Sequence, residues 1–438
     1  MFYKQLLKNK DFLLLWLSHL FSRIAYNLVD FALILLVYEI AQSSFLVGVL
    51  MVFFYLPSFL FSLIAGVYTD VFDRRQVMRI TKILWGILVF LLAFPHVHST
   101  LGWIILISIV IQVVDEFFIP AERASLPNLV GSEMLLLANS VLSTTMYLSV
   151  VLGYGLAGFL VRFLGSSCPF ILAAVLSLLS AGVLGLISPS KSFGGEALRV
   201  EHMYNEDFSF SKLFSRLSHG IFEGINLLIQ QRFLLLVALS IAVFQVTSSC
   251  LMAVLPGYME EGLRIYAQDA SFVFALPLGV GLLGGAYLAG SLGRKENHAS
   301  VIGYGVTIVA TALVTLSFFP RLCGFLGVPN CANLLPFERK ILVSSIAILL
   351  AGLTGLGASL AYVPLNTVFQ NKVADHLRGR SQALVSTITQ GLSVFPVLFV
   401  GALADIIGVV WVLLLLGLVA FGLRLFVVGW VEKAKQLG

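Results

Sequence analysis

Apolar stretches of about 20 residues, separated by short polar breaks, recur along the whole chain. They show no strict alternation of polar and apolar positions, so membrane-spanning helices are favoured over the strands of a barrel. We therefore expect an all-α membrane protein with about twelve spans. Their expected bounds are 12–38, 44–69, 76–95, 100–119, 136–164, 168–187, 233–259, 270–292, 299–319, 340–365, 381–404 and 408–430.

The longest polar interruption, 188–232, divides the spans into two sets of six. This predicts an N-terminal six-helix bundle at 1–187, a cytoplasmic linker at 188–232 and a C-terminal six-helix bundle at 233–438. In the linker, apolar residues recur at helical spacing between Phe208 and Gln231. That spacing predicts an amphipathic helix on the membrane surface.

The two halves resemble each other in sequence. Phe118-Ile119-Pro120 near the end of span four matches Tyr362-Val363-Pro364 near the end of span ten. In spans five and eleven the matched positions are Ser143-Thr144, Gly158, Leu160 and Gly165 with Ser386-Thr387, Gly401, Leu403 and Gly408. Repeats of six spans in one orientation imply a pseudo-two-fold axis along the membrane normal and a central cavity between the halves.

Composition and charge agree with a membrane protein. Only 11% of residues are charged and the mean hydropathy is +0.99, whereas a soluble domain has about 25% charged residues. Twenty of the 27 Lys and Arg residues, Lys82 included, fall on one side of the expected spans. This asymmetry predicts cytoplasmic termini in the inner (cytoplasmic) membrane and argues against nucleic acid as the partner of the basic residues.

Several chemistries have no motif in the sequence. It contains no Gly-x-x-x-x-Gly-Lys-Ser/Thr phosphate loop, no Cys/His cluster with metal-ligand spacing and no Gly-x-Ser-x-Gly elbow. We therefore expect no enzyme, cofactor or bound metal. Cys323 and Cys331 share one expected external loop, where either a disulfide or two free thiols would fit.

Span one carries a polar stripe at helical spacing. Its members are His19, Arg23, Tyr26, Asn27 and Asp30. Ionisable groups in a bilayer normally face a cavity or a partner, so this stripe is the candidate proton and substrate site. Asp30 is the first choice for a protonatable group because burial disfavours a charged carboxylate.

Arg23 has two open interpretations: it holds an anionic substrate group or tunes a nearby acid, or it belongs to a packing ion pair. His19 is more typical of helix packing. Three glutamines, Gln112, Gln245 and Gln390, supply either hydrogen bonds to a cavity or bonds between helices.

The loop after span two contains Gly66, Asp70, Arg74 and Arg75 in the pattern Gly-x-x-x-Asp-x-x-x-Arg-Arg. This pattern resembles the signature of the major facilitator superfamily. The acid at Asp73 is similar to the branch that contains macrolide efflux pumps and the enterobactin exporter. The second-half loop Asp375-His376-Leu377-Arg378-Gly379-Arg380 is also similar to that branch, and Gly293-Arg294-Lys295 after span eight repeats the pattern of Asp73-Arg74-Arg75 after span two.

This resemblance implies a conformational latch. Asp70 would lie at the N-terminus of span eleven, and Arg74 would reach an acid at the end of span four, either Asp115 or Glu116. The alternative is that Arg74 and Arg75 are only positive anchors at the membrane surface.

Two features depart from the family pattern. Gly153 is followed by Tyr154 where antiporter-type members carry Gly-Pro, and span four has Ile111 and Gln112 where many drug/proton antiporters carry an arginine. The resemblance nevertheless implies secondary active transport.

The expected function is export of an amphipathic organic molecule, such as a drug, macrolide or siderophore, by proton-coupled alternating access. The expected partners are this substrate, protons and membrane lipid, and the expected state is a monomer. A lysophospholipid flippase is the alternative transporter, and a non-transporting sensor or scaffold is the alternative of another class.

Overall fold

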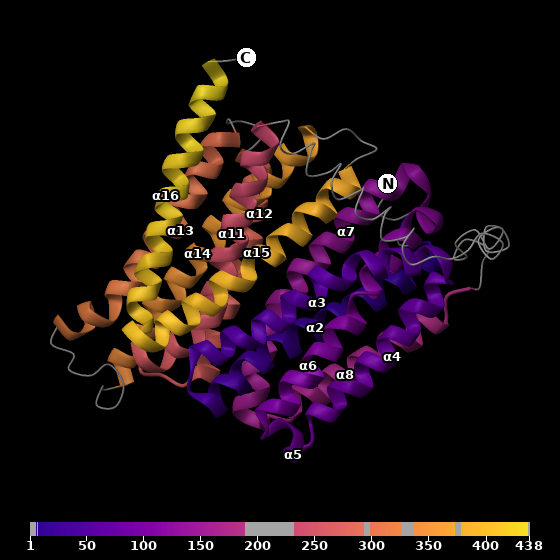
Figure 1. The fold of residues 1–438 in the computed structure, drawn as a ribbon, viewed down its shortest axis with the longest axis horizontal. Helices are drawn as coiled ribbons and strands as arrows, with labels where there is room; N and C mark the ends of the chain where they lie inside the picture. The colour runs from indigo at the N-terminus through magenta and orange to yellow at the C-terminus, as the bar shows by residue number, and fades with distance from the viewer. Residues whose placement is uncertain are drawn as a thin grey trace.

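The computed structural model describes residues 6, 8–188, 232–292, 298–325, 337–372 and 378–436, and these residues contain helices and no strand (Figure 1). The linker expected at 188–232 lies almost entirely outside the described residues. The helices of the first half are α2 (Lys10–Ala41), α3 (Ser44–Val71), α4 (Arg74–Leu92), α5 (Pro95–His98), α6 (Leu101–Asp115), α7 (Phe118–Leu164) and α8 (Cys168–Gly185).

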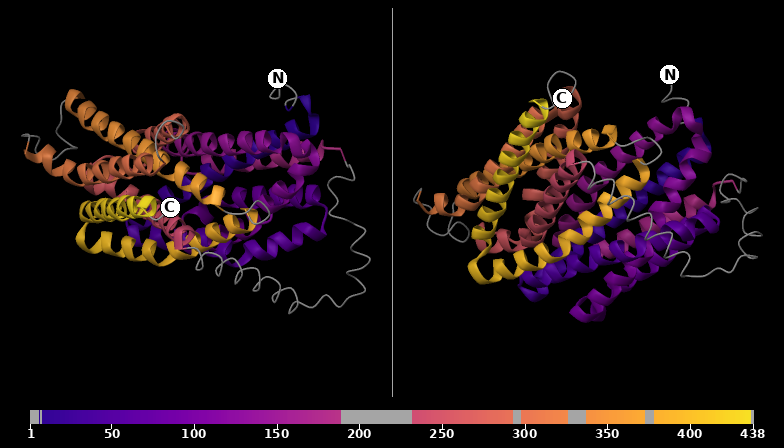
Figure 2. Two further views of the ribbon diagram at one scale, coloured as in Figure 1. Left: turned by 90° about the horizontal axis from the view of Figure 1, so that it is seen from above. Right: turned by 45° about the horizontal axis from the view of Figure 1, so that its top comes forward.

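The second half begins with α11 (Arg232–Gly257), followed by three short helical turns, η1 (Tyr258–Gly262), η2 (Ala267–Asp269) and η3 (Ser271–Ala275). The remaining helices are α12 (Leu276–Leu292), α13 (His298–Phe325), α14 (Phe337–Lys372), α15 (Arg378–Ile407) and α16 (Val409–Gln436). In Figures 1 and 2 the indigo-to-magenta helices and the orange-to-yellow helices form two adjacent groups, one from each half.

Nine stretches within the described residues are long and apolar enough to cross a membrane, and the shorter apolar stretches Ser44–Ser58 and Val409–Leu425 lie in α3 and α16. With α4, they account for the twelve expected spans. α4 is less apolar because it carries Arg74, Arg75, Arg79 and Lys82. The all-α membrane fold expected from the apolar pattern is confirmed.

The connection between spans four and five differs from the expectation. The sequence predicted a break at about 120–135, but helix continues through this segment except at Gly131, which has φ 71°. Glycine tolerates this left-handed conformation at little cost. A single residue thus turns the chain between the two spans.

Glycines also mark matching positions in the two halves. Gly165 ends α7 with φ 92°, and its sequence counterpart Gly408 separates α15 from α16 with φ 90°. Helix pairs match as well: α4 packs on α8 as α13 packs on α16, and α2 packs on α7 as α11 packs on α15. These correspondences are what an internal six-helix repeat predicts.

The two faces of the molecule differ in how the halves meet. We call the face where α2 begins at Lys10 and α3 ends at Val71 the N-terminal face, and the face of the Ala41–Ser44 turn the opposite face. Toward the opposite face, one apolar core runs from α2 and α3 into α11, α13 and α15. Toward the N-terminal face, the buried clusters among the described residues each belong to one half. The halves are therefore joined mainly at the opposite face.

Candidate functional site

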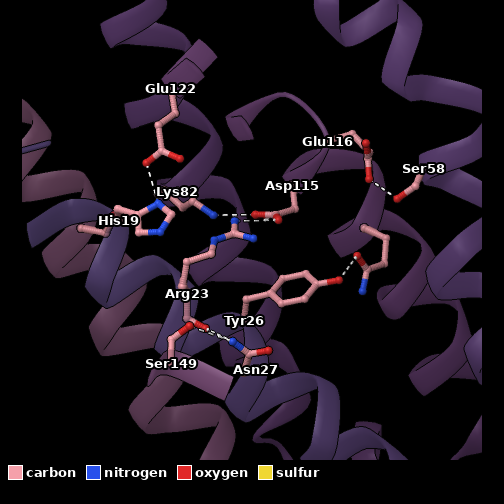
Figure 3. Close-up of polar contacts among 12 residues, drawn as sticks. His19, Arg23, Tyr26, Asn27, Ser58, Lys82, Asp115, Glu116, Glu122 and Ser149 are labelled. Carbon is pink, nitrogen blue, oxygen red and sulfur yellow. Dashed lines mark hydrogen bonds and ion pairs between the residues drawn. The ribbon is translucent and has the colours of Figure 1, made fainter. Parts of the chain in front are cut away.

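The polar stripe of α2 is bonded to α6 and α7 within the first half (Figure 3). Tyr26 Oη donates to Gln112 Oε1 on α6 at 3.2 Å. Asn27 Nδ2 donates to Ser149 Oγ on α7 at 3.1 Å and to the carbonyl oxygen of Arg23 at 2.8 Å. Four of the predicted site residues are thus brought together by the packing of α2 on its neighbours.

Arg23 belongs to a buried ion-pair network. Its Nη2 lies 3.1 Å from Asp115 Oδ2, and Lys82 Nζ on α4 lies 2.5 Å from Asp115 Oδ1. The three residues are only 5%, 1% and 4% exposed for Arg23, Lys82 and Asp115. Both oxygens of one carboxylate are therefore occupied by cations, which favours the packing interpretation of Arg23 over an anion site.

A second pair completes the charge balance of this network. His19 Nδ1 lies 2.8 Å from Glu122 Oε1 on α7, and both residues are buried. Arg23, Lys82 and His19 thus share this interior with the carboxylates of Asp115 and Glu122. Balanced pairing is what makes buried charge tolerable, because a lone ion in an apolar interior carries a large desolvation penalty.

Aromatic rings surround the lysine of the network. Lys82 Nζ lies 4.0 Å from the ring centroid of Phe118 and 5.6 Å from that of Trp85. The electron-rich faces of such rings attract a cation and add to its stabilisation. Lys82 is therefore an interior group.

Two members of the network were missed from the sequence. Lys82 was assigned to the positively charged membrane surface, and that assignment is wrong because its ammonium lies inside the bundle. The available signal was its place six residues inside the expected span 76–95. Glu122 falls between the expected spans 100–119 and 136–164, and only the helix through 118–130 reveals that it faces His19.

The expected partner of Arg74 is also corrected. Asp115 is bound by Arg23 and Lys82, and Glu116 accepts a hydrogen bond from Ser58. Arg74 Nη1 instead donates to the carbonyl oxygen of Ala124 on α7 at 2.8 Å. α7, which begins at Phe118, places a backbone carbonyl where the acid was expected.

The other basic residue of this loop binds a helix end. Arg75 donates to the carbonyl oxygens of Leu184 at 3.0 Å and Gly185 at 2.6 Å, at the C-terminus of α8. A cation at this end complements the helix dipole. Gly66 and Asp70 lie in the last turns of α3, but their side chains are outside the described residues.

Asp30 lies apart from this network. Its Oδ2 accepts a hydrogen bond from Tyr154 Oη on α7 at 2.7 Å, and the Tyr154 ring stacks on Phe31 at 4.9 Å between centroids. The residue is only partly buried. Within the described part of the chain, no Lys or Arg lies within ion-pair distance of its carboxylate. Asp30 is thus a carboxylate without a cationic partner among these residues.

The surroundings of Asp30 connect the two halves. Tyr26 precedes Asp30 by one turn of α2, and Tyr55 on α3 lies within electrostatic range of the Asp30 carboxylate. Tyr55 Oη in turn donates to Ser249 Oγ on α11 at 2.9 Å. The site around Asp30 therefore lies where the first half meets the second.

The remaining predicted residues do not join these clusters. Gln245 and Gln390 lie on α11 and α15 in the second half, and both are half-buried. The structure does not describe the side chains of Cys323, Cys331, Arg294, Lys295, Asp375, Arg378 and Arg380. The possible disulfide and the second-half loop motifs thus stay predictions.

A family model described as Major Facilitator Superfamily matches residues 15–396 of this chain. The chain belongs to the Major Facilitator Superfamily. It is accordingly a membrane transporter of the secondary type and not an enzyme.

Two curated superfamily members resemble the sequence. An uncharacterized MFS-type transporter YjbB of Bacillus subtilis (strain 168) is 29% identical over 159 residues, which is 36% of this chain and 39% of that protein. An uncharacterized MFS-type transporter y4rN of Sinorhizobium fredii is 27% identical over 329 residues, which is 72% of this chain and 75% of that protein. Neither relative is named for a substrate.

Solved structures of several transporters share the fold. A peptide transporter POT in complex with sulfate superposes with a TM-score of 0.72 at 12% identity, covering 97% of this chain and 95% of that chain. The nucleoside transporter NupG gives 0.67 at 11% identity, covering 96% and 99%. A bacterial homologue of the human lysosomal transporter Spinster, inward-facing and unoccupied, gives 0.65 at 14% identity, covering 95% and 94%. At these identities the likeness establishes the fold alone.

The pair Gly153-Tyr154, which stands where antiporter-type members carry Gly-Pro, has a structural role. A side-chain carbon at Gly153 would lie 2.6 Å from Asn27 Cβ and 2.9 Å from the backbone nitrogen of Leu28. This glycine therefore allows α7 to approach α2 closely. The next residue is Tyr154, whose hydroxyl then reaches Asp30.

Proposed function

We propose that this transporter exports amphipathic organic cations in exchange for protons, and that Asp30 binds the two in turn. The observation that carries the proposal is the Asp30 carboxylate, half-buried at the junction of the halves and without a cation among its described neighbours. An intramembrane acid of this kind is a functional site by default. A substrate cation and a proton are the two ways to neutralise it.

The chemistry around Asp30 favours a cation over an anion. Tyr154 donates its hydroxyl to the carboxylate, Tyr26 precedes Asp30 by one turn of α2, and Tyr55 lies within electrostatic range of Asp30. Aromatic residues recognise ammonium-type ligands. Arg23, the other candidate for substrate contact, is neutralised by Asp115. This combination supports a basic drug such as a macrolide and argues against an anionic siderophore.

The Asp30 carboxylate alone could couple the substrate cation to the proton, because it can bind only one of them at a time. A proton on Asp30 would remove the charge that holds the substrate cation, and its loss would restore the site. Because one monovalent cation leaves as one proton enters, this exchange moves no net charge, and the pH difference across the membrane drives it. The excess of Lys and Arg on the N-terminal face supports cytoplasmic termini and a site loaded from the cytoplasm.

Transport in proteoliposomes tests the proposal. The protein would be reconstituted with an imposed proton gradient, and uptake of tetraphenylphosphonium, a lipophilic cation without a titratable group, would be followed together with internal pH. Wild-type protein should accumulate the cation as protons move the other way. Asp30→Asn should abolish accumulation, while Glu39→Gln, an exposed acid on the same helix, should leave it unchanged.

Full proton-driven accumulation by Asp30→Asn would exclude the proposal. Translocation of a lysophospholipid that needs no proton gradient and is insensitive to Asp30→Asn would instead favour the flippase. Cation binding without any flux would favour the sensor or scaffold.

A further inference from the structure

At the opposite face, Asp405 joins the two halves. It lies in the last turn of α15, and its carboxylate accepts hydrogen bonds from Ser43 Oγ at 2.6 Å, from the Ser44 backbone N–H at 2.8 Å and from the Phe45 backbone N–H at 3.2 Å. Ser43 is the N-cap of α3. Asp405 therefore binds the free N–H groups at the positive end of a helix from the other half.

The backbones of α3 and α15 approach closely beside this contact. A side-chain carbon at Gly401 would lie 2.6 Å from the carbonyl oxygen of Ser44, and one at Gly48 would lie 3.0 Å from that of Val397. Any larger residue at Gly401 would force the helices apart. These glycines let the Asp405 carboxylate reach the first turn of α3.

A second group of contacts joins the halves at the same face. Arg162 at the end of α7 pairs with Asp269 in η2. Ser271 Oγ donates to the carbonyl oxygen of Tyr154 at 2.7 Å and accepts from the Gly158 N–H at 2.8 Å. Gly158 and Gly401 are counterparts in the internal repeat, and both lie at the contact between halves.

The same helix pair carries an acid at its other end. Asp70 lies in the last turn of α3 on the N-terminal face, where α15 begins at Arg378. α3 and α15 thus each carry an aspartate in the last turn, and Asp405 lies beside the first turn of the other helix. We infer that Asp405 is the opposite-face counterpart of Asp70: it latches the transporter in the state closed at the opposite face and must release α3 when that face opens.

The apolar core agrees with this role. The halves share one core toward the opposite face and have separate clusters toward the N-terminal face among the described residues. The opposite face is therefore closed in this structure, and Asp405 binds α3 in that closed state. A latch at Asp405 requires only alternating access by the two halves, whether or not Asp30 exchanges protons for cations.

Spin-label distances across the opposite face test this latch. Labels on His96 in α5 and on Tyr266, which is 68% exposed in the second half, would report the separation of the halves. The full chain, with its four cysteines replaced by serine, would be measured in lipid nanodiscs. Asp405→Asn should raise the ratio of long to short distances several-fold, up to about tenfold.

A second variant removes one hydrogen bond and keeps the carboxylate. Ser44→Pro deletes the N–H at the first helical position, where proline is well tolerated, and the extended Ser43 (φ −143°, ψ 121°) suits a following proline. It should shift the distances in the same direction by a smaller factor. This variant decides the test if Asp405→Asn does not fold.

The control is Glu39→Gln, which removes an exposed negative charge near this face and leaves the first turn of α3 untouched. It should leave the distances unchanged. Unchanged distances in both test variants, or an equal shift in Glu39→Gln, would overturn the latch.

Discussion

The interiors of the two halves are stabilised by different chemistry. In the first half, the described helices bury a network of ionised groups, Arg23, Lys82, Asp115 and Glu122, together with His19. In the described second half, Asp269 in the short turn η2 is the buried acid, and the buried polar residues of helices α11–α16 carry hydroxyl groups. Ser240, Thr354 and Ser393, for example, bond to carbonyls of their own helix. Charge is thus concentrated in one of two halves that pack alike.

Small residues take the place of ion pairs in the second half. Side-chain carbons at Gly281 and Gly355 would lie only 2.0 Å from the carbonyl oxygen of Gly352 and 1.9 Å from that of Leu278, so α12 and α14 meet backbone to backbone. Close approach of small residues is a main source of helix association in lipid. The two halves therefore share the arrangement of their helices, but buried ion pairs stabilise the first half and close glycine contacts stabilise the second.

Removing the shared carboxylate should have the largest effect on stability. Asp115→Asn leaves Arg23 and Lys82 buried without their counter-charge, so the free energy of unfolding should fall by about 3–5 kcal/mol. Thermal unfolding of the purified protein in detergent measures this loss. The double variant Lys82→Met/Asp115→Asn should recover part of it, and a double variant no better than Asp115→Asn would contradict the network.

A methyl group between α12 and α14 should destabilise the second half by less. Gly355→Ala overpacks a backbone contact and should cost about 1–3 kcal/mol in the same unfolding assay. Gly284→Ala on α12 is the matched control, because a side-chain carbon there has no neighbour within 4 Å. Equal stability of the two variants would show that close packing is not what stabilises this half.

The hydroxyl of Tyr154 should have a moderate effect on binding. Tyr154→Phe removes the donor to Asp30 but keeps the ring, so the ionised carboxylate that holds a cation loses a hydrogen bond. The dissociation constant for tetraphenylphosphonium should rise by about tenfold, as expected for one bond to a charged group. Equilibrium binding to detergent-solubilised protein checks this, and an unchanged constant would separate Tyr154 from the site.

The ion pair at the opposite face should contribute least to stability. Arg162 is 39% exposed at its side chain, so solvent screens its attraction to Asp269. Arg162→Gln should lower the free energy of unfolding by at most about 1 kcal/mol. A loss as large as that of Asp115→Asn would contradict the distinction between buried and exposed pairs.

The sequence predicted the fold because lipid imposes helices on long apolar runs. It also predicted the stripe of α2, since spacing alone places Arg23 and Asp30 on one side of a helix. It did not predict the partners of that stripe. Lys82 and Glu122 lie on α4 and α7, and which residues of separate helices meet is decided by packing details such as the close contact at Gly153.

Proton release on substrate binding tests the account most directly. Tetraphenylphosphonium carries no proton, so protons released into weakly buffered detergent solution on its addition come from the protein. The account predicts release of about one proton per bound cation at the acidic end of a series between about pH 5 and pH 8, and no release from Asp30→Asn. Equal release from Asp30→Asn, or cation binding by the wild type without release at any of these pH values, would contradict it.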